Sequence, residues 1–489
     1  MQAAKCRIKQ QLQRFSCFHL KSEWKKGLFF GIIEVLNNNK NLERKPFMSS
    51  ILSTVSLESN RQIKINFNGG DLSSDGGLLL VKEFAAKTGL SRLVKKQFRT
   101  TDTAAMRQHT DADNLMQTIY QIIGAYFEDD CADELTSDPV MTAILEKKSL
   151  ASQPTLSRFF NRMDNKTLGQ FDQITRKMRQ VIYSIRKPEH MLFDLDSTLL
   201  NTYGNQEGEG FNYHYQAHGY HPLLCYDGLT GDLLKVELRD GTQYCSKDAD
   251  AFMIPLMQEY REEYPAMPLY LRGDSGFASP DLYEACEDND CKYAIRLKQN
   301  STLVKLAEVA DEALYRATRQ NQVDYAVEYG EFMYQAGSWS KPRRVVFKIE
   351  KPKDQLTHLY TFIVTTLEME PYQIVQFYCG RGKMENFIKE GKDGFDFSSV
   401  SSSSRVVNAN RLQVHALAYN LFNWFRRLVL PASMRRQRVD TVRLKLLKVA
   451  AKAIHSARYL VFKLCSSCPY QKEFYESLSN IRSLSVQLE

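Results

Sequence analysis

The chain has no apolar run of the roughly 18–20 residues that a membrane span requires. Its ten cysteines are scattered over 489 residues, which favours reduced thiols over a disulfide framework. The apolar stretch at Gly27–Val35 follows a basic segment, but Glu34 interrupts it and no small-residue cleavage site follows, so it does not match a signal peptide. These absences exclude a membrane-spanning protein and a small disulfide-rich one. They predict a soluble intracellular protein.

Complete zinc motifs and internal repeats are also missing. His214, His218 and His221 are closely spaced, but no fourth ligand accompanies them. Cys465 and Cys468 form a single Cys-x2-Cys pair without a second pair. We therefore expect ordinary structural roles for these side chains rather than a zinc site.

Net charge is small but unevenly divided along the chain. The total is +8, from 65 Lys and Arg against 57 Asp and Glu. Residues 1–47 carry +7 and residues 405–489 carry +11, which leaves −10 for residues 48–404. If translation starts at Met48, the protein is nearly neutral, at +1. An acidic middle followed by a basic tail predicts a carboxylate-rich site beside a polyanion-binding arm.

The length and the changes in residue pattern predict six segments rather than one core. Three strand-like runs in hairpin order, followed by helix–strand alternation, indicate a mixed α/β sheet. The predicted segments are a basic extension expected to be disordered (1–60), a helical N-terminal domain (61–187), the first part of an α/β core (188–300), a β-rich insertion (301–370), the second part of the core (371–430) and a basic, mainly helical C-terminal region (431–489).

Acidic residues stand where predicted strands end. Asp194 and Asp196 are two apart on the apolar run that starts at Met191, so their side chains share one face. Asp274 ends another predicted strand, which starts at Pro268, and it is followed by Ser-Gly, where a turn must begin. Ligands of open α/β sheets gather beyond the carboxyl ends of strands, and Mg²⁺ prefers hard oxygen ligands. A single acid in such a place can equally cap a turn or a helix.

A further polar set lies on the helical segment predicted near 371–390. In a regular helix Arg381, Glu385 and Lys392 lie about 60°, 20° and 40° around the axis from Tyr378. The four side chains would therefore form one narrow stripe. Glycines at 380 and 382 disfavour a helix by roughly 1 kcal/mol each, so propensity alone does not explain the segment.

This set resembles the Tyr-x2-Arg-x3-Glu-x6-Lys signature of bacterial insertion-sequence transposases of the DDE type. Asp196-Ser197-Thr198 resembles the neighbourhood of that family's first aspartate, and Asp274 its second. The resemblance spans roughly residues 65–465 and includes the β-rich insertion and the basic C-terminus. It implies an RNase H-like core, a DNA-binding role for the helical N-terminal domain, and a cytoplasmic protein of a bacterium.

The resemblance also implies a chemistry and partners. Asp196, Asp274 and Glu385 would be the catalytic residues and would hold two divalent ions, Mg²⁺ with Mn²⁺ as a substitute. Asp194 stays open as an alternative first ligand. Cut-and-paste cleavage and strand transfer would act on double-stranded DNA, both transposon ends and target, through a homodimer in the synaptic complex. Tyr378, Arg381 and Lys392 would grip phosphates at the transposon end.

Two further DNA contacts are predicted. Trp339, beside the basic run Lys341–Arg344, could stack on a flipped base as in similar transposases, although a core or surface aromatic residue is the simpler interpretation. Arg435 and Arg436 belong to a basic stretch that alternates with Leu and Val and fits an amphipathic helix facing DNA phosphates.

Other functions compete with this interpretation. Asp194 and Asp196 also fit motif I of haloacid dehalogenase-type phosphatases, with Asp194 as nucleophile. That family's late Gly-Asp-x3-4-Asp element is missing, because the aspartate after Asp274 is Asp281. A catalytically inactive transposase-derived DNA-binding protein and a structure-specific nuclease of RNase H fold are the remaining alternatives.

Overall fold

The computed structural model describes residues 54–486 apart from 105, 322, 354 and 356. The expected extension 1–60, including Met48, therefore lies almost entirely outside the described residues. Two units are distinguished, Met1–Gly70 and Asp71–Glu489. In the first, β1 (Val55–Ser56) pairs antiparallel with β2 (Lys64–Ile65). No helix in the described part of the chain is long and apolar enough to cross a membrane.

A mixed sheet of eight strands organises the second unit, in the order β12-β13-β14-β11-β10-β4-β8-β9. Its core strands are β4 (Met191–Ser197), β8 (Leu223–Asp227), β9 (Leu233–Glu237), β10 (Leu269–Gly273) and β11 (Cys291–Leu297). The first three form an antiparallel meander, and β10 and β11 add to β4 in parallel. The parallel crossovers are α10 (Ala249–Glu263) and α11 (Pro280–Asp288). This strand order confirms the predicted RNase H-like α/β fold.

The β-rich insertion continues this sheet instead of forming a sheet of its own. Its elements are α12 (Ser301–Leu306), α13 (Glu308–Asn321), β12 (Ala326–Tyr334), β13 (Arg343–Lys351) and β14 (Leu359–Thr365). β14 pairs antiparallel with β11, with Phe362 opposite Leu297. β13 is apolar on both faces, since Val345, Val346 and Phe347 are all buried, and a strand buried on both faces belongs inside a larger sheet.

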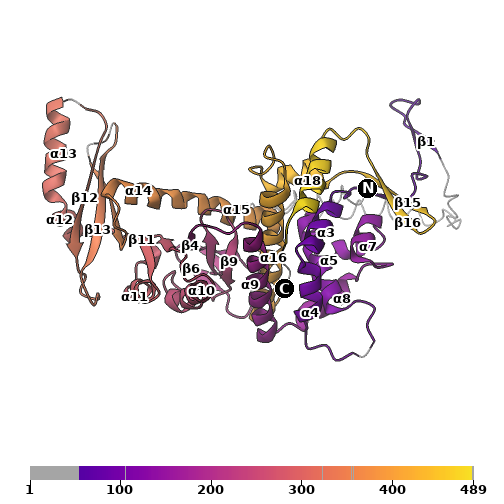
Figure 1. The fold of residues 1–489 in the computed structure, drawn as a ribbon, viewed down its shortest axis with the longest axis horizontal. Coiled ribbons are helices and arrows are strands. Elements are labelled where there is room, and N and C mark those ends of the chain that lie inside the picture. The colour runs from indigo at the N-terminus through magenta and orange to yellow at the C-terminus, as the bar shows by residue number, and fades with distance from the viewer. Residues whose placement is uncertain (1–53, 105, 322, 354, 356, 487–489) are drawn as a thin grey trace, which may run out of the picture. The chain divides into compact units, whose positions relative to one another are not determined.

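The helical segment predicted near 371–390 is present but is not one regular helix. It consists of α14 (Pro371–Cys379), a 3₁₀ turn η2 (Gly380–Gly382) and α15 (Lys383–Phe395). Figure 1 shows α14 leading from the insertion strands back to α15 beside α16 (Arg405–Val429). The segment thus joins the insertion to the core across the carboxyl ends of the parallel strands.

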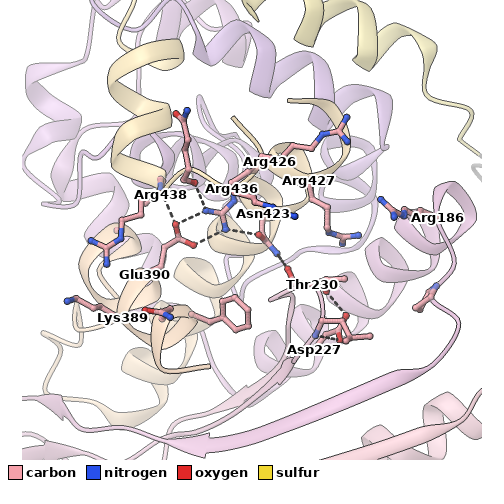
Figure 2. Close-up of a pocket in the computed structure, with 18 of the residues that line it drawn as sticks. Arg186, Asp227, Thr230, Lys389, Glu390, Asn423, Arg426, Arg427, Arg436 and Arg438 are labelled. Atoms are coloured by element: carbon pink, nitrogen blue, oxygen red, sulfur yellow. Dashed lines mark hydrogen bonds and ion pairs between the residues drawn. The ribbon is translucent and has the colours of Figure 1, made fainter. Parts of the chain in front are cut away.

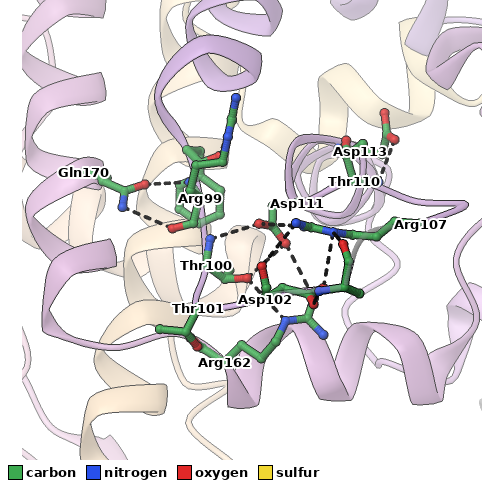
Figure 3. A network of polar contacts seen from close by, with 12 residues as sticks. Arg99, Thr100, Thr101, Asp102, Arg107, Thr110, Asp111, Asp113, Arg162 and Gln170 are labelled. Carbon is green, nitrogen blue, oxygen red and sulfur yellow. Dashed lines mark hydrogen bonds and ion pairs between the residues drawn. The ribbon is translucent and has the colours of Figure 1, made fainter.

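Helices α3 to α9 precede the sheet, as predicted. They are α3 (Leu78–Lys87), α4 (Leu90–Gln97), α5 (Asp111–Ile123), α6 (Cys131–Glu134), α7 (Pro139–Leu145), α8 (Gln153–Asn161) and α9 (Asn165–Ile185). α8 begins where Pro154 in the first turn predicts it. Figure 3 shows how polar contacts fix the loop before α5: buried Asp111 accepts from the backbone N–H of Thr100 at 2.9 Å and pairs with Arg107 at 3.3 Å.

The C-terminal region differs most from the prediction. It is not one amphipathic helix but a series of short elements: α17 (Val439–Val442), a π-helical turn (Arg443–Leu447), β15 (Ala451–Ser456), β16 (Tyr459–Leu464) and α18 (Gln471–Ser483). β15 pairs with β3 (Leu72–Ser73), and α18 packs against α3. The buried Arg443 donates to the carbonyls of Ile122 and Ile123. This region is therefore part of the same core as the N-terminal helices.

Candidate active site

The first candidate aspartates lie on the central strand β4, and their surroundings differ. Asp194 is fully buried and its two oxygens bind Arg272 of β10, with Nε–Oδ1 at 2.6 Å and Nη2–Oδ2 at 2.7 Å. The remaining guanidinium nitrogen of Arg272 donates to the carbonyl of Phe377. Both oxygens of Asp194 are thus occupied inside the sheet. This carboxylate is not accessible as a nucleophile, and it is poorly placed to bind a metal ion.

Asp196 lies at the carboxyl end of β4 and is partly accessible. Its Oδ2 is 2.9 Å from Nη2 of Arg381, and its Oδ1 accepts from the backbone N–H of Ser197 at 2.8 Å. Burial raises the pKa of Asp196 to about 6, Arg381 opposes this rise, and the carboxylate of Asp274 adds to it. Asp196 is therefore a carboxyl group close to a second one.

That second carboxylate, Asp274, follows the neighbouring parallel strand. Gly273 of β10 is the register partner of Leu195 on β4, so Asp274 and Asp196 come next on adjacent strands. Asp274 Oδ1 accepts from the N–H of Gly276 at 2.7 Å and caps the 3₁₀ turn η1 (Ser275–Phe277). Its capping role does not exclude a functional one, because the other oxygen has no hydrogen bond within the described residues. The parallel register thus brings the two carboxylates together.

Arg381 reaches this pair from the 3₁₀ turn η2. Its side chain is buried and also donates to the carbonyl of Leu195 at 3.1 Å. Burial disfavours the charged guanidinium, but Asp196 and Asp274 outweigh it and raise the pKa of Arg381. Among the described residues, Nε of Arg381 has no hydrogen-bond partner. The guanidinium thus neutralises the carboxylates and keeps one buried donor unused.

Lys392 and Tyr378 flank the same strand end. Lys392 Nζ donates to the carbonyl of Leu199 at 2.8 Å and lies 3.4 Å from the hydroxyl of Thr198. Tyr378 is half-buried at the end of α14, and its pKa is raised by burial and, less strongly, by Asp274. Of the four side chains predicted to share a stripe, Arg381 and Lys392 therefore contact the end of β4, whereas Tyr378 packs against the apolar cluster that includes Ala294 and Ile363.

Glu385 lies in the first turn of α15 and is exposed. No group of three His, Cys, Asp or Glu side chains that could hold a metal ion occurs in the part of the chain that the structure describes. The stripe assumed about 100° per residue, whereas the 3₁₀ turn η2 advances about 120°, which adds roughly 60° over three residues. The turn shifts Glu385 and Lys392 together, because both follow it on α15, so it changes their phase relative to Tyr378 and not relative to each other.

Some residues of the site could not be identified from sequence motifs. Ser197 donates to the thiol of Cys245 at 3.3 Å, and the hydroxyl of Tyr215 donates to the carbonyl of Ser197 at 3.3 Å. Burial raises the pKa of Tyr215 to about 12, with Asp196 and Asp274 contributing. Arg272 could have been suspected, because an arginine inside an apolar strand needs a buried acid as its partner.

Trp339 is a core aromatic residue, the simpler of its two interpretations. Only 8% of it is exposed, and its ring contacts Tyr283 and Tyr334 edge-on. It also lines a cavity of about 240 Å³ that extends to Ser275 and Gly276, next to Asp274.

Arg435 and Arg436 lie elsewhere, in the turn after α16. Both side chains are exposed and line a cleft of about 900 Å³ (Figure 2). Of the closely spaced histidines, His218 pairs with Glu209, and His221 is hydrogen-bonded to the carbonyl of Gln243.

An RNase H-like sheet with two carboxylates at adjacent strand ends defines the class of fold and site. The family model of transposase DDE domain group 1 matches residues 55–486, so the chain belongs to this transposase family. No curated protein matches the sequence of this chain.

Solved structures with similarity to the chain include two transposase complexes. One is the piggyBac transposase synaptic complex with hairpin DNA, at 14% identity and a TM-score of 0.38, covering 76% of this chain and 80% of that one. Another is the Mos1 transposase paired-end complex with the left transposon end, at 12% identity and a TM-score of 0.16, covering 46% and 73%.

Proposed function

We propose that this transposase binds the terminal inverted repeats of an insertion sequence and catalyses metal-dependent DNA strand cleavage and strand transfer there. The observation that carries the proposal is the pairing of Asp196 and Asp274 at the adjacent carboxyl ends of β4 and β10. Two carboxylates whose charges repel each other form a site that attracts a cation. The two hydrogen bonds that Asp194 accepts from Arg272 favour Asp196 over Asp194 in this role.

The donor set fits a hard divalent ion. Asp196 and Asp274 would hold Mg²⁺, for which Mn²⁺ could substitute, through oxygen atoms, with Glu385 as the third carboxylate. When bound, two such ions would lower the charge barrier for attack of water or a 3′-hydroxyl on a phosphodiester. Arg381 now supplies the positive charge beside Asp196, at 2.9 Å, and would be free to bind a phosphate once a metal ion replaces it.

Glu385 requires a movement to take part. Its exposed position in the first turn of α15 leaves it free to turn, and the preceding 3₁₀ turn contains Gly380 and Gly382. Nothing lies within 4 Å of a Cβ atom placed on Gly382, so the chain has room to rearrange there. We propose that metal and DNA binding convert this turn and bring Glu385 to the two aspartates.

The remaining predicted contacts with DNA belong to the same proposal. Tyr378 and Lys392 stand beside the strand end, where the phosphate next to the cleaved bond would lie. Trp339 would act as one wall of the cavity beside Asp274. Arg435 and Arg436 would bind backbone phosphates at a distance. Double-stranded transposon ends and target DNA are the proposed substrates, and a homodimer would hold two ends together.

The proposal is tested with purified protein and a labelled duplex that carries both ends of the element encoding this chain. In Mg²⁺ or Mn²⁺, we expect cleavage at the element ends. Asp196→Asn, Asp274→Asn and Glu385→Gln should each reduce the rate by at least roughly 10²–10³-fold, as loss of one preorganised charge does in other enzymes. Glu368→Gln is the matched control, because the Glu368 side chain is 94% exposed and distant from these residues in the sequence.

The possible failures are informative in different ways. Binding to the ends without cleavage in either metal would identify an inactive DNA-binding relative. Cleavage of branched DNA irrespective of terminal sequence would identify a structure-specific nuclease. Normal cleavage by all three carboxylate variants would disprove the proposed site.

A further inference from the structure

A basic cleft lies near the amino-terminal end of β4, opposite to the end that carries Asp196. Eight Lys and Arg side chains line its volume of about 900 Å³, and two of them, Arg426 and Arg427, pair with Glu390 and Asp232. We define the basic cleft by the other six, which are Arg186, Lys187, Lys389, Arg435, Arg436 and Arg438. They come from three separate segments: the connection from α9 to β4, the helix α15, and the turn between α16 and α17 (Figure 2). Arg435 and Arg436 are among the DNA contacts predicted above.

The basic cleft is separate from the carboxylate pair. Its lining includes Asp227, the register partner of Phe193 near the start of β4, and residues 186–190, which precede that strand. Asp196 lies five residues beyond Met191, so the two ends of the strand are roughly 17 Å apart at about 3.3 Å per residue. A ligand in the basic cleft therefore does not compete with one at the aspartates.

Most acids in the lining already have partners within the protein, including Asp227, which accepts from the N–H of Leu229 and the hydroxyl of Thr230. Glu390 binds two nitrogens of Arg426 at 2.7 and 2.8 Å and accepts from the N–H of Val439. Asp227 is buried, and burial raises its pKa to about 6. Asp440 is exposed and pairs with Arg443 at 3.1 Å, and exposed Glu189 and Asp393 remain. The acidic lining therefore offsets only part of the positive charge.

The cations, in contrast, are available. Arg186, Lys389, Arg436 and Arg438 are exposed and form no ion pair within the described residues. Arg435 uses only Nε, in a bond to the carbonyl of Leu430. Unpaired arginine forks on the walls of one cleft suit a ligand that carries several phosphates.

We propose that the basic cleft is a second DNA site, which holds the sugar-phosphate backbone of duplex DNA away from the bond that is cleaved. This inference rests on the proposed function for the kind of ligand, and it deepens that function by assigning where the flanking duplex is held. Phosphate contacts of this kind position the duplex without reading its sequence. Since neighbouring base pairs are about 3.4 Å apart, DNA that starts at the aspartates must extend by at least about five base pairs to reach the basic cleft.

The experiment measures DNA affinity as a function of salt concentration for full-length protein. The double variant Arg436→Ala/Arg438→Ala should lower the slope of log K against log salt by about 1.8, because each phosphate that is no longer neutralised changes the slope by about 0.9. A second variant, Lys389→Ala, should lower it by about 0.9 and tests the cleft from another element. The matched control Lys472→Ala/Arg482→Ala removes the same charge from exposed positions on α18 and should leave the slope unchanged.

Duplex length sharpens the test. Wild type and double variant should differ on a duplex that extends about 20 base pairs beyond the cleaved bond and should bind equally to one that ends within about three, since the shorter duplex cannot span the distance to the cleft. Equal slopes on the long duplex, or the same change in the α18 control, would overturn the inference. Thermal unfolding of each variant checks that the fold is kept.

The two proposals fail in distinguishable ways. If the protein cleaves element ends but the slopes do not change, the basic cleft is not a DNA site and the proposed function stands. If the slopes change as expected but no cleavage occurs in Mg²⁺ or Mn²⁺, the basic cleft binds DNA and the proposed catalysis is wrong.

Discussion

Two Asp–Arg pairs lie two residues apart along β4. One is inside the sheet and is called the inner pair here, and the other lies at the carboxyl end of the strand, where it forms the edge cluster together with Asp274. Inside, Asp194 and Arg272 satisfy each other through two short hydrogen bonds, and no solvent reaches the carboxylate. In the edge cluster, Arg381 forms an ion pair with Asp196, while the nearby carboxylate of Asp274 repels the carboxylate of Asp196. The inner pair is complete and structural, whereas the edge cluster is incomplete and can gain by binding a cation. Both regions contain acids, and they differ in whether those acids are fully paired.

The largest expected effect comes from breaking the inner pair. Asp194→Asn keeps the shape of the side chain but leaves the charge of Arg272 buried without its partner, which typically costs about 3–5 kcal/mol of unfolding free energy. Urea unfolding measured by circular dichroism checks this value, with the exposed Glu368→Gln as control. A destabilisation below about 1 kcal/mol would show that Asp194 is not the structural partner described above.

Removing the charge of Asp196 from the edge cluster should change the stability in the opposite direction. The pKa of Asp196 is raised from its ordinary value of 3.8 to about 6 in the folded protein, so the folded state binds more protons than the unfolded state between these pH values. Stability therefore falls as pH rises from about 4 to 6 and stays reduced above pH 6. Removing the charge should remove this penalty.

We therefore expect Asp196→Asn to be more stable than wild type at pH 7 and about equal to it below pH 4. The difference between the two pKa values, which already includes the attraction to Arg381, corresponds to at most about 3 kcal/mol of stability. Urea unfolding at pH 4, 5.5 and 7 measures the difference. A variant that is less stable than wild type at pH 7 would contradict the assignment of Asp196 to an incompletely paired cluster.

Much of this comparison could be predicted from local sequence. The apolar run that ends at Asp196, and Asp274 before a turn, identify two strand ends, and parallel pairing then brings them together. Asp194 could not be separated from Asp196 in this way, because the two share one face and only a partner distant in sequence, Arg272, distinguishes them. Motif spacing identified the residue types, but tertiary pairing determines their roles.

Long-range pairing and helix phase account for what was missed. The C-terminal hairpin is completed by β3, whose residues are more than 370 positions away, so no local pattern identifies it. The polar stripe assumes one regular helix from Tyr378 onward, and the 3₁₀ turn at Gly380–Gly382 changes the phase of Glu385 and Lys392 relative to Tyr378. Both glycines lower helix propensity to a similar extent. Their surroundings differ, because a Cβ atom on Gly380 would meet Arg272, whereas one on Gly382 would meet no atom within 4 Å.

The smallest expected effects come from those two glycines. A Cβ atom on Gly380 would lie 2.7 Å from Nη1 of Arg272, a guanidinium that Asp194 holds in place and that cannot easily move away. Gly380→Ala should therefore strain the inner pair, which offsets its gain in helix propensity and gives a net destabilisation of about 1 kcal/mol, measured by urea unfolding.

Gly382→Ala has the opposite expectation and tests the movement of Glu385. With nothing within 4 Å of the added Cβ and a helical backbone at this position, the substitution should stabilise the fold by about 0.5–1 kcal/mol. If the turn must convert to bring Glu385 to Asp196 and Asp274, the same substitution should slow cleavage several-fold while Tm rises. Paired measurements of Tm and cleavage rate decide this, because a stabilised variant that cleaves as fast as wild type would show that the turn does not rearrange during the reaction.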